Sequence, residues 1–257
     1  MTKPITIISS MATRQILHEL TATYSRNTGR AVEVQSVGGV DAARRIRAGE
    51  VFDIVVLASD ALQALSDDGF VAGDSIREFA RSPTAMAVGA RPRGPSEMAV
   101  GARARGPGDM PVGGLHPAPC DEDAIKALIA SVQRIGVSTG RSGTGIAMLL
   151  TRWGMLDPAA RWIVQAAPGV PVARLLANGD ADVGFQQLSE LIGQPGIEIV
   201  GIVPEALQPM TVFACGLGRA ADGIGAHALQ RALVSDATAA TKRQNGMEPA
   251  GARPVRD

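Results

Sequence analysis

The sequence predicts an α/β protein built from two lobes. Three observations support this fold class. Short apolar runs of strand type alternate with stretches that carry apolar residues at helical spacing. Glycines follow the ends of several helical stretches, and the length of 257 residues fits two modest lobes. The order strand–helix–strand implies parallel strands joined by crossover helices.

The first third of the chain is expected to contain three strand–helix units. Apolar runs and alternation place the strands at residues 5–8, 31–37 and 52–57. Helical spacing places the helices at residues 13–27, 41–48 and 61–67. Each helix is followed by a glycine, which tolerates a positive φ, and these are Gly29, Gly49 and Gly69.

A tandem repeat follows this part of the chain. Residues 86–95 reappear with few changes at 98–107. Two copies are too few for a solenoid, which needs at least about three repeats. We expect a local duplication that lengthened a loop within residues 85–119, with only one copy in the sheet. The alternative is a basic flap over an acidic partner, formed by Arg91, Arg93, Arg103 and Arg105.

The second half of the chain continues the α/β pattern. Helical spacing predicts helices at residues 121–132, 145–153, 172–177 and 225–240. Strands are expected at residues 135–137, 183–187, 198–203 and 211–216.

Composition excludes several classes of partner. Lys+Arg and Asp+Glu are equal at 25 each, and aromatic residues make up only 3%. A balanced chain with few stacking platforms predicts no nucleic-acid partner. No apolar run approaches the roughly 18 residues of a membrane span, so we expect no membrane insertion. The start shows no signal-peptide pattern, which predicts a cytoplasmic protein as given, or a periplasmic one if a signal peptide has been removed.

Cysteine and histidine give no sign of a reactive centre. Cys120 and Cys215 form neither a disulfide framework nor a zinc pattern. The histidines are scattered at His18, His116 and His227, and each is more readily explained as a surface or core residue. No metal-ligand spacing, phosphate-binding loop or Ser-His-Asp order appears. We therefore expect no cofactor and no metal.

Two glycine- and serine-bearing turns are the strongest functional signal. One spans residues 7–12 and the other spans 135–145, and each lies between a predicted strand and a predicted helix. Such turns leave backbone N–H groups free at a helix N-terminus, where they can hold an anion. The candidate ligand residues from this signal are Ser9, Ser10, Met11, Arg141, Ser142, Gly143 and Thr144.

Purely structural interpretations remain open for some of these residues. Ser9 and Ser10 could simply cap the first helix, and Ser59 could cap a later helix or form the lip of a cleft. Gly38 and Gly39 could only permit a tight turn, or present their amides to a ligand. Arg141 is the sharpest candidate, because an arginine in a glycine- and serine-rich turn has little packing role there.

The order of several short segments resembles the molybdate-binding family of periplasmic receptors. The segments are Ile-Ile-Ser-Ser-Met at 7–11, Val-Gly-Gly-Val-Asp-Ala-Ala-Arg-Arg-Ile at 37–46, Phe-Asp-Ile-Val-Val-Leu-Ala-Ser at 52–59, Ser-Gly-Thr-Gly at 142–145, Asn-Gly-Asp-Ala-Asp-Val-Gly at 178–184 and Asn-Gly-Met-Glu-Pro at 245–249. The resemblance implies the type 2 periplasmic-binding-protein fold, with a ligand cleft between two α/β lobes. We expect lobe one at 1–83 plus 192–257, and lobe two at 84–191.

The resemblance also implies site residues. In molybdate receptors two serines, backbone amides and a tyrosine hold the oxyanion. Ser10 matches the first serine, whereas the second falls on Gly39 and the tyrosine falls on Gln187. Thr144 and Val170 lie at amide-donating positions. The fork of an arginine, here Arg141, and a glutamine amide suit a planar carboxylate better than a tetrahedral oxyanion.

Three functional hypotheses follow. The leading one is a solute-binding protein for a small anion, with an ABC transporter as its partner if it is exported. The second is a cofactor-independent isomerase of an unsaturated polycarboxylate, because the 141–145 loop and Gln187 resemble the aconitate-isomerase branch of the family. Neither turn supplies a carboxylate or histidine as its base. The third is a ligand-sensing effector domain, which no DNA-binding helix pair supports.

Overall fold

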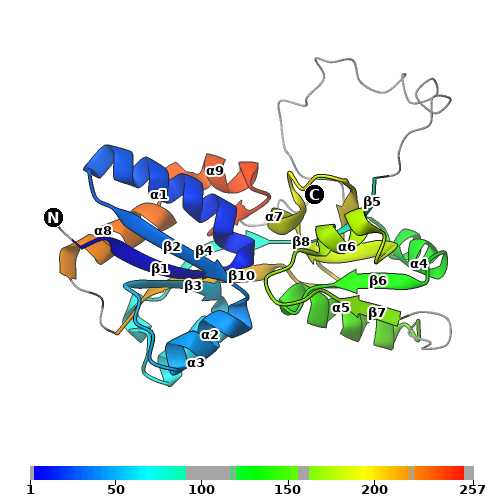
Figure 1. Cartoon of the computed structure of the whole chain (residues 1–257), viewed down its shortest axis with the longest axis horizontal. Helices are drawn as coiled ribbons and strands as arrows, with labels where there is room; N and C mark the ends of the chain where they lie inside the picture. Colours follow the sequence, from blue (N-terminus) through cyan, green and yellow to red (C-terminus); the bar gives the residue numbers. More distant parts are fainter. Residues whose placement is uncertain are drawn as a thin grey trace, which may run out of the picture.

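The computed structural model describes residues 3–90, 117, 120–155, 162–219, 221 and 223–251. The chain forms two β-sheets, each covered by its own helices (Figure 1). The two resulting lobes lie side by side, and the chain runs from the first into the second and then returns. The α/β class and the two-lobed architecture expected from the sequence are confirmed.

The first lobe contains a six-stranded mixed sheet of order β11-β4-β10-β3-β1-β2. Strands β1 to β3 are parallel, whereas β10 runs antiparallel to β3 and β4, and β11 antiparallel to β4. The strands are β1 (Ile5–Ser10), β2 (Val32–Val37), β3 (Ile54–Ala58), β4 (Arg77–Ser82), β10 (Thr211–Leu217) and β11 (Glu248–Pro249).

Helices cover both faces of this sheet because its strands carry apolar residues on both sides. In β1, Ile7 packs in the core with α1 and α8, and Ile8 packs in the core with α2 and α3. Gly29 ends α1 in the left-handed region with φ of 69°. The helices of this lobe are η1 (Met11–Thr13), α1 (Arg14–Thr28), α2 (Gly39–Arg47), α3 (Ser59–Asp67), η2 (Gly73–Ser75), α8 (Gly223–Val234), η4 (Asp236–Thr238) and α9 (Ala239–Gln244).

The second lobe is built on a five-stranded sheet of order β7-β6-β8-β5-β9. Its β6 is parallel to β7 and β8, and its β5 is antiparallel to β8 and β9. The strands are β5 (Thr84–Gly89), β6 (Arg134–Val137), β7 (Trp162–Gln165), β8 (Val183–Gln187) and β9 (Ile197–Ile202). Helices α4 (Glu122–Ala130) and α5 (Arg141–Arg152) pack on one face, and α6 (Val172–Asn178) and α7 (Leu188–Leu191) pack on the other.

The structure corrects three details of the sequence prediction. The sheets are mixed, because the first strand after each crossing between the lobes, β5 or β10, runs antiparallel to both of its neighbours. The helix expected at 225–240 is broken at Ser235, whose extended backbone (ψ of 154°) separates α8 from η4 and α9. Among the described strands and α-helices, those not predicted are β4, β7, β11 and the short α7.

The position of β9 bears on the lobe boundary. This strand pairs with β5 and so lies in the second sheet, although residues from 192 onward were expected in lobe one. Val203 and Leu207 pack in the core of the second lobe, so we propose that the chain returns to the first lobe between Leu207 and the start of β10. The start of the first repeat copy lies in β5, as expected. The second copy and the basic flap of Arg91, Arg93, Arg103 and Arg105 lie outside the described residues.

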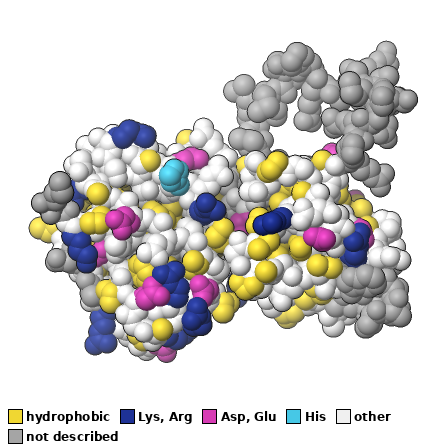
Figure 2. All heavy atoms as spheres, in the orientation of Figure 1, with side chains coloured by type: hydrophobic (Ala, Val, Ile, Leu, Met, Phe, Trp, Pro, Cys, Tyr) yellow, Lys and Arg dark blue, Asp and Glu magenta, His cyan; other side chains and the backbone are white. Residues whose placement is uncertain are grey.

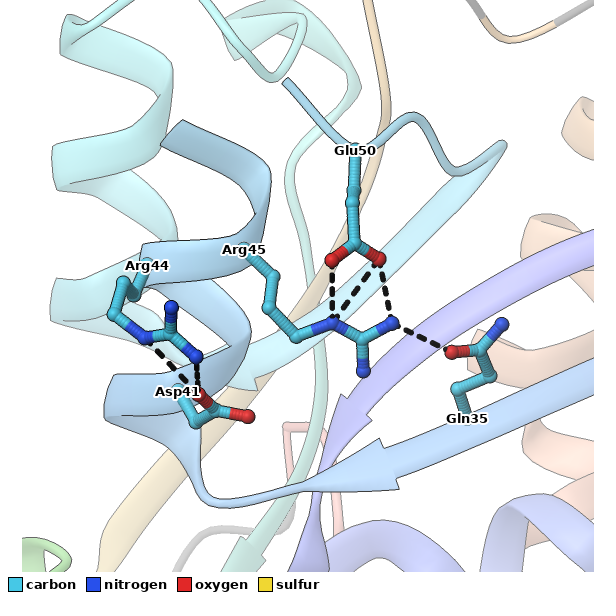
Figure 3. Close-up of polar contacts among 5 residues, drawn as sticks. All are labelled: Gln35, Asp41, Arg44, Arg45 and Glu50. Atoms are coloured by element: carbon cyan, nitrogen blue, oxygen red, sulfur yellow. Dashed lines mark hydrogen bonds and ion pairs between the residues drawn. The ribbon is translucent and has the colours of Figure 1, made fainter. Parts of the chain in front are cut away.

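The arginines of α2 are paired within the first lobe. Arg45 donates to both carboxylate oxygens of Glu50 and, at 2.8 Å, to Gln35, while Arg44 pairs with Asp41 (Figure 3). Arg47 pairs with Asp68.

Over the visible face, cationic and anionic side chains are interspersed (Figure 2), as expected for a chain of zero net charge. In the part of the chain that is described, no helix has the length and apolar character to cross a bilayer.

Candidate functional site

A cavity of about 530 Å³ lies between the two lobes, and residues of both lobes line it. The candidates from the sequence that line this cavity are Ser10, Met11, Gly38, Gly39, Arg141, Ser142, Thr144, Val170 and Gln187. The turns at 7–12 and 135–145, more than a hundred residues apart in sequence, therefore face one shared space.

Three sequence candidates do not line the cavity. Ser9 is buried inside the first lobe, where its hydroxyl lies 2.8 Å from that of Ser36. Ser59 is exposed as the first residue of α3, and Asp60 lines the cavity instead. Gly143 has a packing role, because a Cβ there would lie 1.9 Å from the carbonyl oxygen of Ser138. The tight turn before α5 therefore requires glycine at position 143.

Helices α2, α3 and α5 begin at the cavity, and none of them has a side-chain cap on its N-cap residue. Their N-cap residues are Gly38 for α2, Ala58 for α3 and Gly140 for α5. All three residues line the cavity. The first N–H groups of a helix have no intrahelical acceptor, and the helix dipole places partial positive charge at this end. The arrangement favours an anion in the cavity, and α2 and α5 lie on the facing sides of the two lobes (Figure 1).

Two backbone amides that the family resemblance implied as donors are already engaged. The Thr144 N–H donates to Gly140 at 3.1 Å, and the Val170 N–H donates to Ala167 at 2.9 Å. Both residues line the cavity, but neither offers a free N–H. The N–H groups at the start of α5, from Arg141 to the glycine at 143, lack intrahelical acceptors and are the better donors.

Unpartnered polar atoms are concentrated at this cavity. Among the described residues, the buried side-chain oxygens and nitrogens without a hydrogen-bond partner are Ser10 Oγ, Gln187 Oε1 and Gln208 Oε1. All three residues line the cavity. Leaving a buried polar group unpaired costs about 1–3 kcal/mol. Because all three unpaired atoms lie at one cavity, we expect a polar ligand there to complete their hydrogen bonds.

The two glutamines are oriented by threonine hydroxyls on neighbouring strands. Gln187 Nε2 donates to Thr211 Oγ1 at 2.7 Å, and Gln208 Nε2 donates to Thr84 Oγ1 at 2.8 Å. The bond from Gln187 joins the end of β8 in the second lobe to the start of β10 in the first. Gln208 was not among the sequence candidates, because it lies in a loop without a motif.

An ion pair joins the lobes at the cavity. Arg141 at the start of α5 donates to Asp60 on α3 at 2.6 Å, and the two side chains are 61% and 54% exposed. Because both line the cavity and remain accessible to water, the pair lies at its mouth. Arg141 is the only cation among the described lining residues.

A carboxyl group that the sequence analysis missed also lines the cavity. Glu190 lies on the short α7, and its Oε1 accepts a hydrogen bond of 2.7 Å from Gln186 Nε2. Burial raises the pKa of this carboxyl to about 7, and the Gln186 bond opposes that rise. Only one of Gln186 and Gln187 was expected to face the cleft, whereas both line it. The strand alternation ends where β8 passes into α7 at Gln187.

Other groups considered from the sequence are not at the site. His18 and His227 do not line the cavity, and His116 lies outside the described residues. Cys120 and Cys215 are both free. Within the described ranges, no three His, Cys, Asp or Glu side chains gather as a metal-ligand group would. The charged residues among the described lining of the cavity are thus Asp60, Arg141 and Glu190.

Comparison with known proteins places the chain in a family. The family model of bacterial extracellular solute-binding proteins matches residues 5–248. The chain belongs to this family. Its fold is the two-lobed type 2 fold of periplasmic binding proteins, as the sequence resemblance implied.

Two solved structures share this fold. The chain superposes on the periplasmic molybdate-binding protein of Azotobacter vinelandii with a TM-score of 0.72 and 18% identity, covering 95% of this chain and 98% of that one. It superposes on L-phospholactate-bound PEB3, a protein of Campylobacter jejuni, with a TM-score of 0.63 and 15% identity, covering 95% and 99%.

A curated relative is an enzyme. The aconitate isomerase of a Pseudomonas species is 28% identical over 256 residues, which cover 97% of this chain and 89% of the relative. The chain is thus similar to proteins named for binding and to a relative named for catalysis, and the fold alone does not separate the two.

Proposed function

We propose that this protein binds a small carboxylate anion in the cavity between its lobes. As an extracellular-type solute-binding protein it would capture that anion outside the inner membrane and deliver it to an ABC transporter. This location corresponds to the periplasmic alternative of the sequence analysis rather than to the cytoplasmic one.

The observation that carries the proposal is the convergence of unsatisfied hydrogen-bonding groups on one space. Three uncapped helix starts contribute N–H groups, and Ser10, Gln187 and Gln208 contribute unpartnered polar atoms. Buried polar groups are paired in the great majority of proteins. A bound anion with several oxygens would supply acceptors for the helix N–H groups and for the Ser10 hydroxyl. The unpartnered atoms of Gln187 and Gln208 are amide oxygens, which accept, so they would pair with an O–H group of the same guest.

Arg141 supports a carboxylate over a tetrahedral oxyanion. The guanidinium is planar and presents parallel N–H donors that match the two oxygens of a carboxylate. Its partner Asp60 is itself a carboxylate, one oxygen of which accepts a single hydrogen bond from the Arg141 guanidinium at 2.6 Å. PEB3, which shares the fold, carries L-phospholactate in one of its structures, and this ligand has both a carboxylate and a tetrahedral phosphate group. A ligand carboxylate could replace Asp60 on Arg141 when it enters the cavity.

A binding screen tests the proposal. The purified chain is titrated calorimetrically with di- and tricarboxylates, including citrate and cis- and trans-aconitate, and with molybdate, tungstate and sulfate. We expect micromolar or tighter binding of at least one carboxylate and weaker binding of the tetrahedral oxyanions. Binding of molybdate alone would refute the carboxylate preference, and no binding of any anion would refute the proposal.

A second candidate function is isomerisation of an unsaturated polycarboxylate. Two observations favour it, namely the aconitate isomerase relative that covers 97% of this chain and the carboxyl of Glu190 in the cavity. The first test is to incubate trans-aconitate with the protein and follow the appearance of cis-aconitate by proton NMR. Conversion would show an enzyme, and tight binding without conversion would leave the receptor function.

A further inference from the structure

We propose that Glu190 is the catalytic group that carries the proton in the isomerisation of an unsaturated polycarboxylate bound in this cavity. The proposal rests on the second candidate function. Glu190 would be the base that the turns at 7–12 and 135–145 lack. The proposal is based on the position of Glu190, on the fixed orientation of the neighbouring Gln186 amide and on the charges around the carboxyl group.

Helix α7 holds Glu190 at the junction of the lobes. The Leu188 N–H that opens this helix donates to Pro83 at 2.9 Å, in the segment where the chain crosses between the sheets. Leu188 and Leu191 are buried against the second sheet, and α7 also contacts η1 of the first lobe. Glu190 lies between these anchors and lines the cavity. Its position relative to a bound guest is therefore set by packing on both sides.

Gln186 fixes the orientation of the Glu190 carboxyl. Gln186 Oε1 accepts the backbone N–H of Val172 at 2.7 Å, and this donor determines which end of the amide is oxygen. The amide nitrogen must then face Glu190, to which it donates at 2.7 Å. A single donor on one oxygen leaves the carboxyl able to take up and release a proton, whereas several donors would hold it ionised.

The described elements that contact α7 most extensively are β5, β8 and η1, and none of them contains an ionisable side chain. Two further contacts reach α7: the Ser82 hydroxyl of β4 lies 3.4 Å from that of Ser189, and the turn at Gly246 packs against Leu188. Of the charged side chains beside these contacts, Arg81 pairs with Glu78, and Lys242 lies over the Phe79 ring. The other charged groups that line the described cavity are Asp60 and Arg141, which bind each other. Burial raises the pKa of Glu190 to about 7, which is suited to acid–base catalysis near neutral pH.

The proposed step balances without a cofactor. The Glu190 carboxylate removes a proton from the methylene carbon beside the double bond. The electron pair of that C–H bond forms a new double bond to the central carbon, and the old double bond becomes a negative charge shared with the adjacent carboxylate. The protonated Glu190 then returns the proton to the former vinyl carbon. No atom is gained or lost, and nothing is oxidised or reduced.

The other charged and donor groups at the cavity would bind the substrate rather than transfer the proton. Arg141 and the amides at the start of α5 are positioned to hold the substrate carboxylates and the negative charge that forms during the step. Asp60 is the only other described carboxylate at the cavity. It is bound to Arg141 and more than half exposed, which makes it a poor base for a shielded C–H bond.

The test uses Glu190→Gln, with Glu198→Gln as the matched control on the exposed surface of the same lobe. Conversion of trans-aconitate is followed by proton NMR in D2O, and binding is measured by calorimetry. We expect Glu190→Gln to slow turnover by a factor of about 100 or more. Its dissociation constant should stay within about tenfold of the wild type, and Glu198→Gln should match the wild type in both. In the wild type, kcat/KM should rise with pH through about 7.

A second variant guards against a folding defect. Glu190→Asp keeps the carboxyl but shortens its reach, so we expect partial turnover above that of Glu190→Gln. Wild-type turnover in Glu190→Gln would overturn the role of Glu190 while leaving the isomerase function intact. Binding without turnover in the wild type would overturn both of these and leave the receptor function. Absence of both binding and turnover would overturn the carboxylate site itself.

Discussion

The two lobes contribute different chemistry to the same cavity. The first lobe offers the hydroxyl of Ser10, the backbone at Gly38 and Gly39, and Asp60. The second lobe offers Arg141, several glutamine and serine groups, and Glu190. The cationic and proton-carrying groups of the described site are therefore on the second lobe.

This difference indicates a division of roles. The first lobe presents mostly neutral hydrogen-bond donors, namely a hydroxyl and backbone N–H groups, which would bind an anion of almost any shape. The second lobe adds a planar cation and a carboxyl, which discriminate by geometry and by protonation. We infer that ligand identity depends mainly on the second lobe.

The turn glycines of the two lobes should differ in their tolerance of a methyl group. In Gly143→Ala the new Cβ would lie 1.9 Å from Ser138 O, so the turn before α5 must open. We expect a loss of roughly 3 kcal/mol in unfolding free energy. In Gly39→Ala the nearest atom is Ser10 Cβ at 3.9 Å, so stability should change by less than about 0.5 kcal/mol. Urea unfolding measures both, and equal losses would show that the two turns are packed alike.

Arg141→Ala should weaken carboxylate binding more than oxyanion binding. The variant removes the only cation among the described lining residues. We expect the dissociation constant of the best carboxylate to rise by about 10–100-fold, because charge-assisted hydrogen bonds contribute about 1.5–3 kcal/mol. Calorimetric titration of both ligand classes gives the ratio. Unchanged carboxylate affinity would remove Arg141 from the site.

The stability of Glu190→Gln relative to wild type should depend on pH. Burial raises the pKa of Glu190 from 4.5 to about 7 in the folded chain. Between these values the folded state holds a proton that the unfolded state has lost, so wild-type stability falls as pH rises. Glutamine does not titrate. We expect the variant to gain about 2 kcal/mol relative to the wild type between pH 5.5 and pH 8. Urea unfolding at both pH values tests this, and a constant difference would contradict the raised pKa.

Ser10→Ala should separate stability from binding. The Ser10 hydroxyl is buried without a partner in the ligand-free chain, so its removal should leave the unfolding free energy unchanged or slightly higher. Ligand affinity should fall by about fivefold, since a net hydrogen bond contributes about 1 kcal/mol. Calorimetry and urea unfolding of the same preparation provide both values, and unaltered affinity would show that Ser10 does not contact the ligand.

Asp60→Asn is the smallest expected effect and the reverse of Arg141→Ala. The variant releases the guanidinium from its ion pair, so carboxylates should bind a few-fold more tightly. The gain should shrink at high salt, because exposed ion pairs are screened. Weaker binding in this variant would show that Asp60 positions Arg141 rather than competing for it.

Local signals predicted most of the fold. The helix ends at Gly29 and Gly179 could be predicted from the sequence, because a glycine in the left-handed conformation ends a helix through its local backbone alone. The break at Ser235 is not visible, because serine has no fixed backbone preference and tertiary packing decides. Strand β4 alternates charged and apolar residues too irregularly to stand out, and its pairing with β10 is a long-range contact.

The site was predictable only where it lies on a turn. Ser10 and Arg141 stand at strand–helix turns, and their surroundings follow from local backbone geometry. Glu190 and Gln208 have no local signature, because their significance comes from a cavity that the two lobes create together. Thr144 and Val170 were assigned amide roles by resemblance, but their N–H groups are bonded within their own turns.

The hydrogen bond between Gln187 and Thr211 has a further consequence. A threonine hydroxyl both donates and accepts, so the Gln187 amide can turn over by 180° and keep this bond. One orientation shows the guest an acceptor and the other shows it a donor. The same backbone can thus bind a ligand that presents an ionised oxygen or one that presents a hydroxyl group. A change of ligand specificity at this position would then require no change of fold.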